Sequence, residues 1–148
     1  MLVTLDVLKE IQSKSQNNHI NLKTLYKILQ IPSTIVYDNY DIEHIMELIP
    51  RDKHELSGYF VKINSIRLQL FKEQYASNKI VECVCCGIKA THFKLEGQVG
   101  VTPHLNLYAN DELLTKDHIH PKSLGGKDVL TNLQVMCNTC NVKKGNLL

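Results

Sequence analysis

The chain has 148 residues, enough for one ordinary domain or two small ones. Its hydrophobic content of 43% is typical of a folded protein, and no apolar run reaches the length of about 18 residues that a membrane span needs. The 17 basic and 15 acidic residues give a net charge of +2 and are evenly mixed in both halves of the chain, so neither half is a basic arm and charge alone does not indicate a nucleic-acid partner.

The start of the chain does not resemble an export signal. Residues 1–6 have no basic lead and already contain Asp6. We therefore expect a cytoplasmic protein in a reducing compartment. In such a compartment, paired cysteines indicate a metal site before a disulfide.

Helical periodicity dominates the first half of the chain. Apolar residues recur at helical spacing, Asn21 and Asp41 are suitable N-caps, and Pro32 and Pro50 are suitable stops. The predicted helices cover about residues 2–14, 21–30, 41–49 and 53–75, with a short turn from residue 33 to Val36. Residues 1–78 are therefore predicted to form an all-helical accessory domain.

Two interpretations of this helical region remain open. Helix 21–30, the turn at Pro32 and the next segment could form a helix-turn-helix that reads DNA, or the helices could form a plain bundle. The segment 33–40 contains Asp38 and no Arg or Lys, which favours the bundle, because base reading relies on Arg, Lys, Asn and Gln. DNA binding, dimerisation and partner binding all stay possible roles for residues 1–78.

From residue 79 to residue 148 the pattern changes to cysteines, glycines and short apolar runs. Residues 104–109 alternate apolar and polar side chains, as a half-buried strand does, and Asn110-Asp111 is a turn signal. A second strand is predicted from Leu113 to His118, followed by a glycine loop and a helix from about Asn132. The predicted fold class is α+β, with an all-helical N-terminal region and a mixed C-terminal domain.

Two pairs of cysteines with identical spacing predict a metal site in the C-terminal domain. A two-residue gap lets both thiolates of a tight turn face one ion, and two such pairs complete a tetrahedral site. A closed site of four sulfurs is structural, so we expect structural Zn²⁺ rather than a redox pair. The predicted ligands are Cys83, Cys86, Cys137 and Cys140, although Cys85 could exchange with a neighbour.

A second constellation has the residue types that phosphodiester hydrolysis needs. Asp117 and Asn141 offer oxygen donors for a hard divalent ion, and His118 offers an imidazole as a base. Because Asp117 and His118 are adjacent, a regular strand would place them on opposite faces. The strand must therefore end or bend at this point.

The segments DHIHPKSLGG and TNLQVMCNTCNVKKG together resemble the motif of HNH endonucleases, in the variety with two CxxC zinc knuckles. The resemblance covers about residues 80–146. It implies a ββα-metal fold and a phosphodiester hydrolase. In its terms, His118 matches the general base and Asp117 a ligand of catalytic Mg²⁺ or Mn²⁺. Asn132 matches the residue that pins the loop and orients the base, and Asn141 matches a second ligand of the catalytic ion.

Five further residues near the motif are candidates for contact with the substrate. They are His120, Lys122, Lys127, Lys143 and Lys144. Lysines in such positions suit phosphate contacts that position a strand without reading its bases. Each could instead be a plain solvated side chain.

The resemblance makes an endonuclease that nicks or cuts double-stranded DNA the leading hypothesis. One such site cuts one strand, so cutting both strands would need a homodimer or two visits. The alternatives are a non-catalytic zinc module that binds nucleic acid or protein, and a nuclease of RNA or of modified nucleic acid. Proteins that look like this recur in phages, mobile elements and defence systems.

Overall fold

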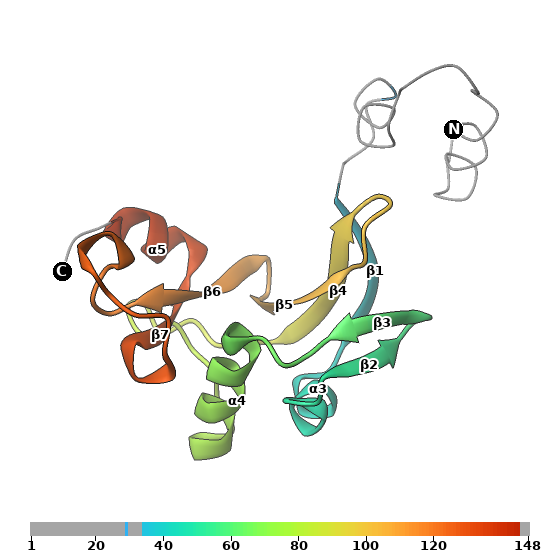
Figure 1. Cartoon of the computed structure of the whole chain (residues 1–148), viewed down its shortest axis with the longest axis horizontal. Helices are drawn as coiled ribbons and strands as arrows, with labels where there is room; N and C mark the ends of the chain where they lie inside the picture. The colour runs from blue at the N-terminus through green and yellow to red at the C-terminus, as the bar shows by residue number, and fades with distance from the viewer. Residues whose placement is uncertain (1–28, 30–33, 146–148) are drawn as a thin grey trace.

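The computed structural model describes residue 29 and residues 34–145. In these residues an α+β fold combines a five-stranded sheet, a separate two-stranded hairpin and three α-helices (Figure 1). The strands are β1 (Thr34–Tyr40), β2 (Lys53–Leu56), β3 (Tyr59–Lys62), β4 (His92–Gln98), β5 (His104–Ala109), β6 (Glu112–His118) and β7 (Leu133–Cys137). The helices are α3 (Ile42–Leu48), α4 (Ile66–Asn78) and α5 (Asn138–Lys144), with 3-10 turns η1 (Lys122–Leu124) and η2 (Leu130–Asn132).

The large sheet has the order β1-β4-β5-β6-β7, and every neighbouring pair is antiparallel. The helix α4 lies against one face of β6 and β7, and α5 lies on the other face (Figure 1). The core on the α4 side includes Phe71, Phe93, Leu95 and Leu107, each with no exposed surface. Over β4 and β5, the opposite face of the sheet carries polar side chains.

The α+β class is confirmed, but the all-helical prediction is wrong for residues 34–40 and 53–62, which form strands. The segment 34–40 is the edge strand β1, which suits its content of Ile, Val and Tyr. The predicted helix 53–75 is instead the hairpin β2–β3 followed by α4. At Ser57 and Gly58, both turn residues have positive φ (51° and 85°), which is the conformation of a two-residue type I′ hairpin turn.

The helix that the sequence predicts from about Asn132 begins later in the structure. Residues 133–137 form β7, which pairs with β6 along its whole length, and the helix α5 begins only at Asn138. Burial on both faces explains the error, because the run from Leu133 to Cys137 is too apolar to show the alternation of an exposed strand. The ββα unit therefore consists of β6, β7 and α5.

Other predicted elements agree with the structure. A helix occupies residues 42–48 with Asp41 as its N-cap residue, and the hairpin 104–118 is present as β5 and β6. The predicted helices 2–14 and 21–30 lie outside the described residues, apart from Leu29. The division near residue 78 stays a prediction; β1, from before it, pairs with β4, from after it. Among the described residues, no helix is long and apolar enough to cross a membrane.

Candidate active site

Four cysteines meet beside the start of α5. The Sγ atoms of Cys83, Cys86, Cys137 and Cys140 all lie within 4.8 Å of one another. The Sγ atoms of Cys86 and Cys137 are 3.8 Å apart, which is the separation of about 3.8 Å expected for two ligands of a tetrahedral Zn²⁺ with Zn–S bonds of 2.3 Å. Cys85 is exposed and is not a member of this cluster.

Backbone amides support the sulfurs of the cluster. The N–H groups of Cys85 and Cys86 donate to Cys83 Sγ at 3.4 and 3.5 Å, and the N–H of Cys140 donates to Cys137 Sγ at 3.4 Å. Burial raises the pKa of the Cys83 thiol, but the amide hydrogen bonds outweigh this effect and lower the pKa to about 6. Burial raises the pKa of Cys137. Four thiolates this close together would repel one another, so they cannot all ionise without a cation. A bound metal ion supplies the positive charge that stabilises all four.

A cleft of about 260 Å³ lies at the end of β6, between the glycine loop and α5. The sequence-predicted residues Asp117, His118 and Asn141 all line this cleft. The strand β6 ends at His118, but Asp117 and His118 both still pair with β7, so the strand does not end or bend between them. The cleft instead lies at the end of the strand, where side chains from both of its faces line it. The full lining consists of Lys116, Asp117, His118, Pro121, Lys122, Ser123, Asn141, Lys144 and Gly145.

Asp117 is a buried carboxylate with two donors. Its Oδ2 accepts a hydrogen bond from Gln134 Nε2 at 2.9 Å and forms an ion pair with Lys144 Nζ at 2.6 Å. Lys144 Nζ also donates to the backbone oxygen of His118 at 2.7 Å. Since Asp117 is only 6% exposed, a cation close to it is needed to compensate for the desolvated charge.

Beside the cleft, His118 Nε2 lies 3.2 Å from Asp128 Oδ1. The two atoms are at ion-pair distance, but they are not aligned as an N–H···O hydrogen bond. Asp128 also accepts two hydrogen bonds from Lys116 Nζ, which lower the pKa of its carboxyl. Asp128 therefore stays negatively charged next to the imidazole.

Asn132 closes the loop that follows β6. Its Oδ1 accepts from the backbone N–H of His120 at 2.9 Å, and its Nδ2 donates to the carbonyls of His120 and Lys127 at 3.2 and 2.8 Å. Its own backbone oxygen accepts from the N–H of Ile119 at 2.8 Å. One side chain thus fixes both ends of the loop immediately after His118.

Gly126 lies where this loop makes its closest approach. A Cβ built on Gly126 would be 1.7 Å from the backbone oxygen of His120. The Gly126 N–H also donates to the Pro121 carbonyl at 2.9 Å. Only glycine fits the space that these contacts leave.

Asn141 faces the cleft from the second turn of α5. Its Nδ2 donates to Thr115 Oγ1 at 2.8 Å, and Thr115 Oγ1 donates in turn to the backbone oxygen of Met136 at 2.7 Å. Because the amide nitrogen is held by Thr115, the amide oxygen of Asn141 is the atom left for another partner. With Asp117, it gives the cleft two oxygen donors of the type that Mg²⁺ and Mn²⁺ prefer.

The structure separates the remaining predicted residues. Lys122 and Lys144 line the cleft. Lys143 lies near the cysteine cluster instead, where it lines another hollow together with Cys140. Lys127 and His120 are exposed residues of the glycine loop outside the cleft lining, and His120 Nε2 is 2.9 Å from the Leu124 carbonyl.

Sequence reasoning missed three residues that contact the site. They are Asp128 beside His118, Gln134 on Asp117, and Thr115 on Asn141. The partnership of Gln134 follows from the β6–β7 register, which pairs Asp117 with Gln134, so it could be found only once residues 133–137 are recognised as a strand. No sequence signal indicates Asp128, because only the closed loop brings it to β6.

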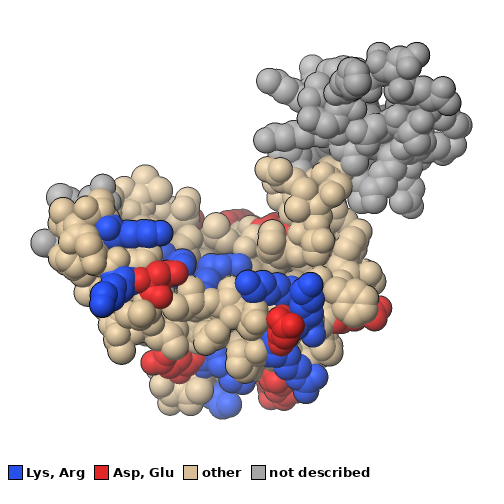
Figure 2. Space-filling model, viewed as in Figure 1, with Lys and Arg blue, Asp and Glu red and all other residues tan. Residues whose placement is uncertain are grey.

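Basic and acidic side chains are interspersed over the face of the molecule that Figure 2 shows. No broad patch of one sign covers this face (Figure 2). A polyanion would therefore depend on a few local lysines rather than on the field of a whole surface.

Comparison with known proteins identifies one region of the chain. No curated protein and no solved structure matches the sequence or the fold of this chain. The family model of the HNH endonucleases matches residues 108–148, which begin at the end of β5 and contain β6, the glycine loop, β7 and α5. The segment that carries the cleft and two of the four clustered cysteines is thus recognised as an HNH endonuclease segment.

Proposed function

We propose that this protein is a metal-dependent endonuclease that hydrolyses phosphodiester bonds in DNA. The observation that carries the proposal is the single cleft that gathers Asp117, His118 and Asn141 within the segment matched by the family model. Asp117 and His118 are the last two residues of β6, whereas Asn141 lies on α5, 23 positions after His118. Their meeting in one cleft is therefore a property of the fold.

His118 is the proposed general base. The charged carboxylate of Asp128 near Nε2 favours the tautomer that keeps its proton on that nitrogen, which leaves Nδ1 free to take a proton from a water. Asn132 and Gly126 hold the backbone that follows His118, and thereby fix the direction of the imidazole. Water activated in this way attacks the phosphorus.

Asp117 and Asn141 are the proposed ligands of a catalytic divalent ion, Mg²⁺ or Mn²⁺. Such an ion, when bound, supplies charge neutralisation at the phosphate and at the departing oxygen. Both residues present oxygen atoms, and Gln134 holds the carboxylate of Asp117 in a fixed orientation. The four-cysteine cluster, by contrast, has no open position and is assigned a structural Zn²⁺.

The proposed substrate is double-stranded DNA in the cytoplasm. Lys122 at the rim of the cleft is placed to contact a phosphate without reading a base. Since one cleft cuts one strand, a homodimer is proposed for cutting both. Residues 1–78 are proposed to be an accessory region that binds DNA, a partner or a second copy.

The test is a plasmid-nicking assay in Mg²⁺ or Mn²⁺ with purified, zinc-loaded protein. We expect His118→Ala to reduce nicking by at least about 100-fold, since a general base contributes about that much or more. The same variant should keep its zinc content and its unfolding temperature. His44→Ala, a matched change at an exposed histidine on α3, should nick as the wild type does. Nicking by His118→Ala at the wild-type rate would refute the assignment.

One observation favours a second candidate, a non-catalytic zinc module. Lys144 Nζ already contacts Asp117 Oδ2 and the His118 carbonyl, so a fixed ammonium compensates the carboxylate without any ion. A metal titration distinguishes the two candidates. The enzyme should bind zinc and, more weakly, Mn²⁺ at a site that Asp117→Ala abolishes, whereas the module should bind zinc alone.

A further inference from the structure

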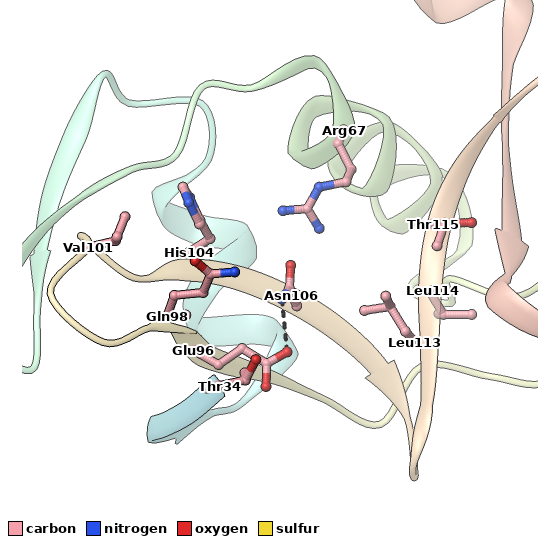
Figure 3. A pocket seen from close by; sticks show the side chains of 11 residues that line it. Thr34, Arg67, Glu96, Gln98, Val101, His104, Asn106, Leu113, Leu114 and Thr115 are labelled. Carbon is pink, nitrogen blue, oxygen red and sulfur yellow. Dashed lines mark hydrogen bonds between the residues drawn. The ribbon is translucent and has the colours of Figure 1, made fainter. Parts of the chain in front are cut away.

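A second cavity lies on the polar face of the sheet, and the proposed chemistry does not use it (Figure 3). Its volume of about 580 Å³ is within the range of about 300–1,000 Å³ typical of small-molecule sites. Polar side chains converge on it from three elements: Arg67 from α4, Glu96 and Gln98 from β4, and His104 and Asn106 from β5 (Figure 3).

Arg67 reaches this cavity through a gap between two strands. The strands β5 and β6 pair only at Tyr108–Leu113 and Ala109–Glu112, so the earlier part of β5 has an open edge. At that edge, Arg67 Nη2 donates to the backbone carbonyl of Leu105 at 2.6 Å. Within the described part of the chain, no carboxylate lies within 4.0 Å of the guanidinium. A half-buried cation with spare N–H donors therefore borders the cavity without an anionic partner.

Glu96 gives the same cavity a negative group. The residue is 6% exposed, and its Oε1 accepts hydrogen bonds from Asn106 Nδ2, at 2.8 Å, and from the Tyr108 hydroxyl. Its Oε2 and the Asn106 side-chain oxygen have no hydrogen-bond partner among the residues that the structure describes. The cavity thus has a donor group at Arg67 and acceptor groups at Glu96 and Asn106 that do not satisfy one another.

The cavity and the cleft are neighbours along β6 and share one of its faces, although Leu114 of the cavity and Lys116 and His118 of the cleft belong to the other face. Alternation along a strand places the side chains of Leu113, Thr115 and Asp117 on one face. Leu113 and Thr115 line the cavity, Asp117 lines the cleft, and the Thr115 hydroxyl bonds to Asn141 of the cleft. From Thr115 at the border of the cavity to Asp117 in the cleft, the strand rises about 7 Å, which is close to the rise of two nucleotides along one DNA strand.

We propose that this cavity binds one unstacked nucleobase, preferentially guanine, from the strand whose phosphate lies in the cleft. The inference rests on the proposed hydrolysis of nucleic acid. An isolated phosphate is a poor ligand here, because Glu96 would repel it. Guanine offers acceptors at O6 and N7 for an arginine and an amino donor at N2 for a carboxylate, on different edges of one ring. Taking a base out of the stack costs least where it is already unpaired.

The test measures binding to a zinc-loaded chain carrying His118→Ala, so that the probe stays uncut. The probes are fluorescent DNA duplexes with one unpaired guanine, adenine, cytosine or thymine, together with a fully paired duplex, and fluorescence anisotropy gives each affinity. We expect the unpaired-guanine duplex to bind about tenfold tighter than the unpaired-thymine duplex. Glu96→Gln keeps an acceptor for Asn106 but removes the charge, and should reduce this ratio to about two.

Two further variants separate recognition from folding. Arg67→Lys keeps a positive charge but loses the planar fork, and should also reduce the preference for guanine. Glu82→Gln, at a half-buried residue paired with Lys89 outside the cavity, should leave the preference unchanged. None of these variants should change the affinity for the fully paired duplex.

Equal affinity for all four unpaired bases, or an unchanged guanine preference in Glu96→Gln, would overturn the inference. Plasmid nicking by the unmodified chain would in that case still support the nuclease assignment. Absence of both DNA binding and nicking would overturn the nuclease assignment and this inference together. The two failures are therefore distinguishable.

Discussion

Replacing Gly126 with alanine should disable the site while leaving the metal cluster intact. The added Cβ would be 1.7 Å from the His120 carbonyl oxygen, whereas such contacts are never shorter than 3.0 Å, so the loop must open by more than an ångström. The atom in the way belongs to the backbone and cannot rotate aside. The displacement occurs two residues after His118, and a misplacement of about 1 Å costs on the order of 100-fold in rate. We expect nicking to fall by about that factor.

The assay is initial-rate nicking of supercoiled plasmid, with zinc content and thermal unfolding measured on the same preparation. The matched control is Gly125→Asn, because Gly125 has φ of 92° with open space around its Cβ position, and asparagine tolerates left-handed backbone. That control should keep activity within about threefold, although left-handed backbone at a non-glycine residue costs on the order of 1–3 kcal/mol of stability. Gly126→Ala that nicks at the wild-type rate while remaining folded would refute the argument that this loop positions His118.

Three further results are expected. Lys144→Met removes a cation that contacts Asp117 and would compete with a metal ion for its carboxylate. Titration calorimetry of the zinc-loaded chain should therefore show Mn²⁺ binding about tenfold tighter than in the wild type. Unchanged or weaker Mn²⁺ binding would contradict this competition between Lys144 and the ion. Cys140→Ser should release zinc in a colorimetric assay and lower the unfolding temperature, and a full zinc complement in this variant would contradict the four-sulfur site. Ser65→Ala removes the acceptor of the Leu68 N–H at the start of α4 and should cost about 1 kcal/mol in urea unfolding, whereas exposed Ser77→Ala should cost less than half of that.

The cleft was easier to predict from the sequence than the fold around it. Asp117, His118 and Asn141 belong to a dense motif in which residue type and spacing are both restricted by chemistry. The cysteine pairs have the same property, because two thiolates on one ion require a tight turn. Residues with such local requirements can be assigned to a shared site without a correct secondary structure.

The elements between these residues depend on longer-range pairing, and here the predictions failed. Leu56, Phe60 and Ile63 have helical spacing, yet the Ser57-Gly58 turn makes a hairpin of the segment. That dipeptide was the available signal. The strand β7 is buried by α4 on one side and α5 on the other, so its sequence lost the alternation that identifies exposed strands. The partners of Asp128 and Arg67 could not be predicted, since each residue reaches its partner through tertiary closure.

The length of α5 has a consequence for how the protein responds to its metals. Seven residues are fewer than the about 12–15 that a helix needs to persist alone in water, so this helix takes its orientation from its attachments. At one end are Cys137 and Cys140, and near the other is the ion pair of Lys144. Loss of the sulfur-bound ion would therefore free Asn141 to rotate away from Asp117. Catalytic competence should then decline in proportion to zinc vacancy during stepwise chelation, even when magnesium is saturating.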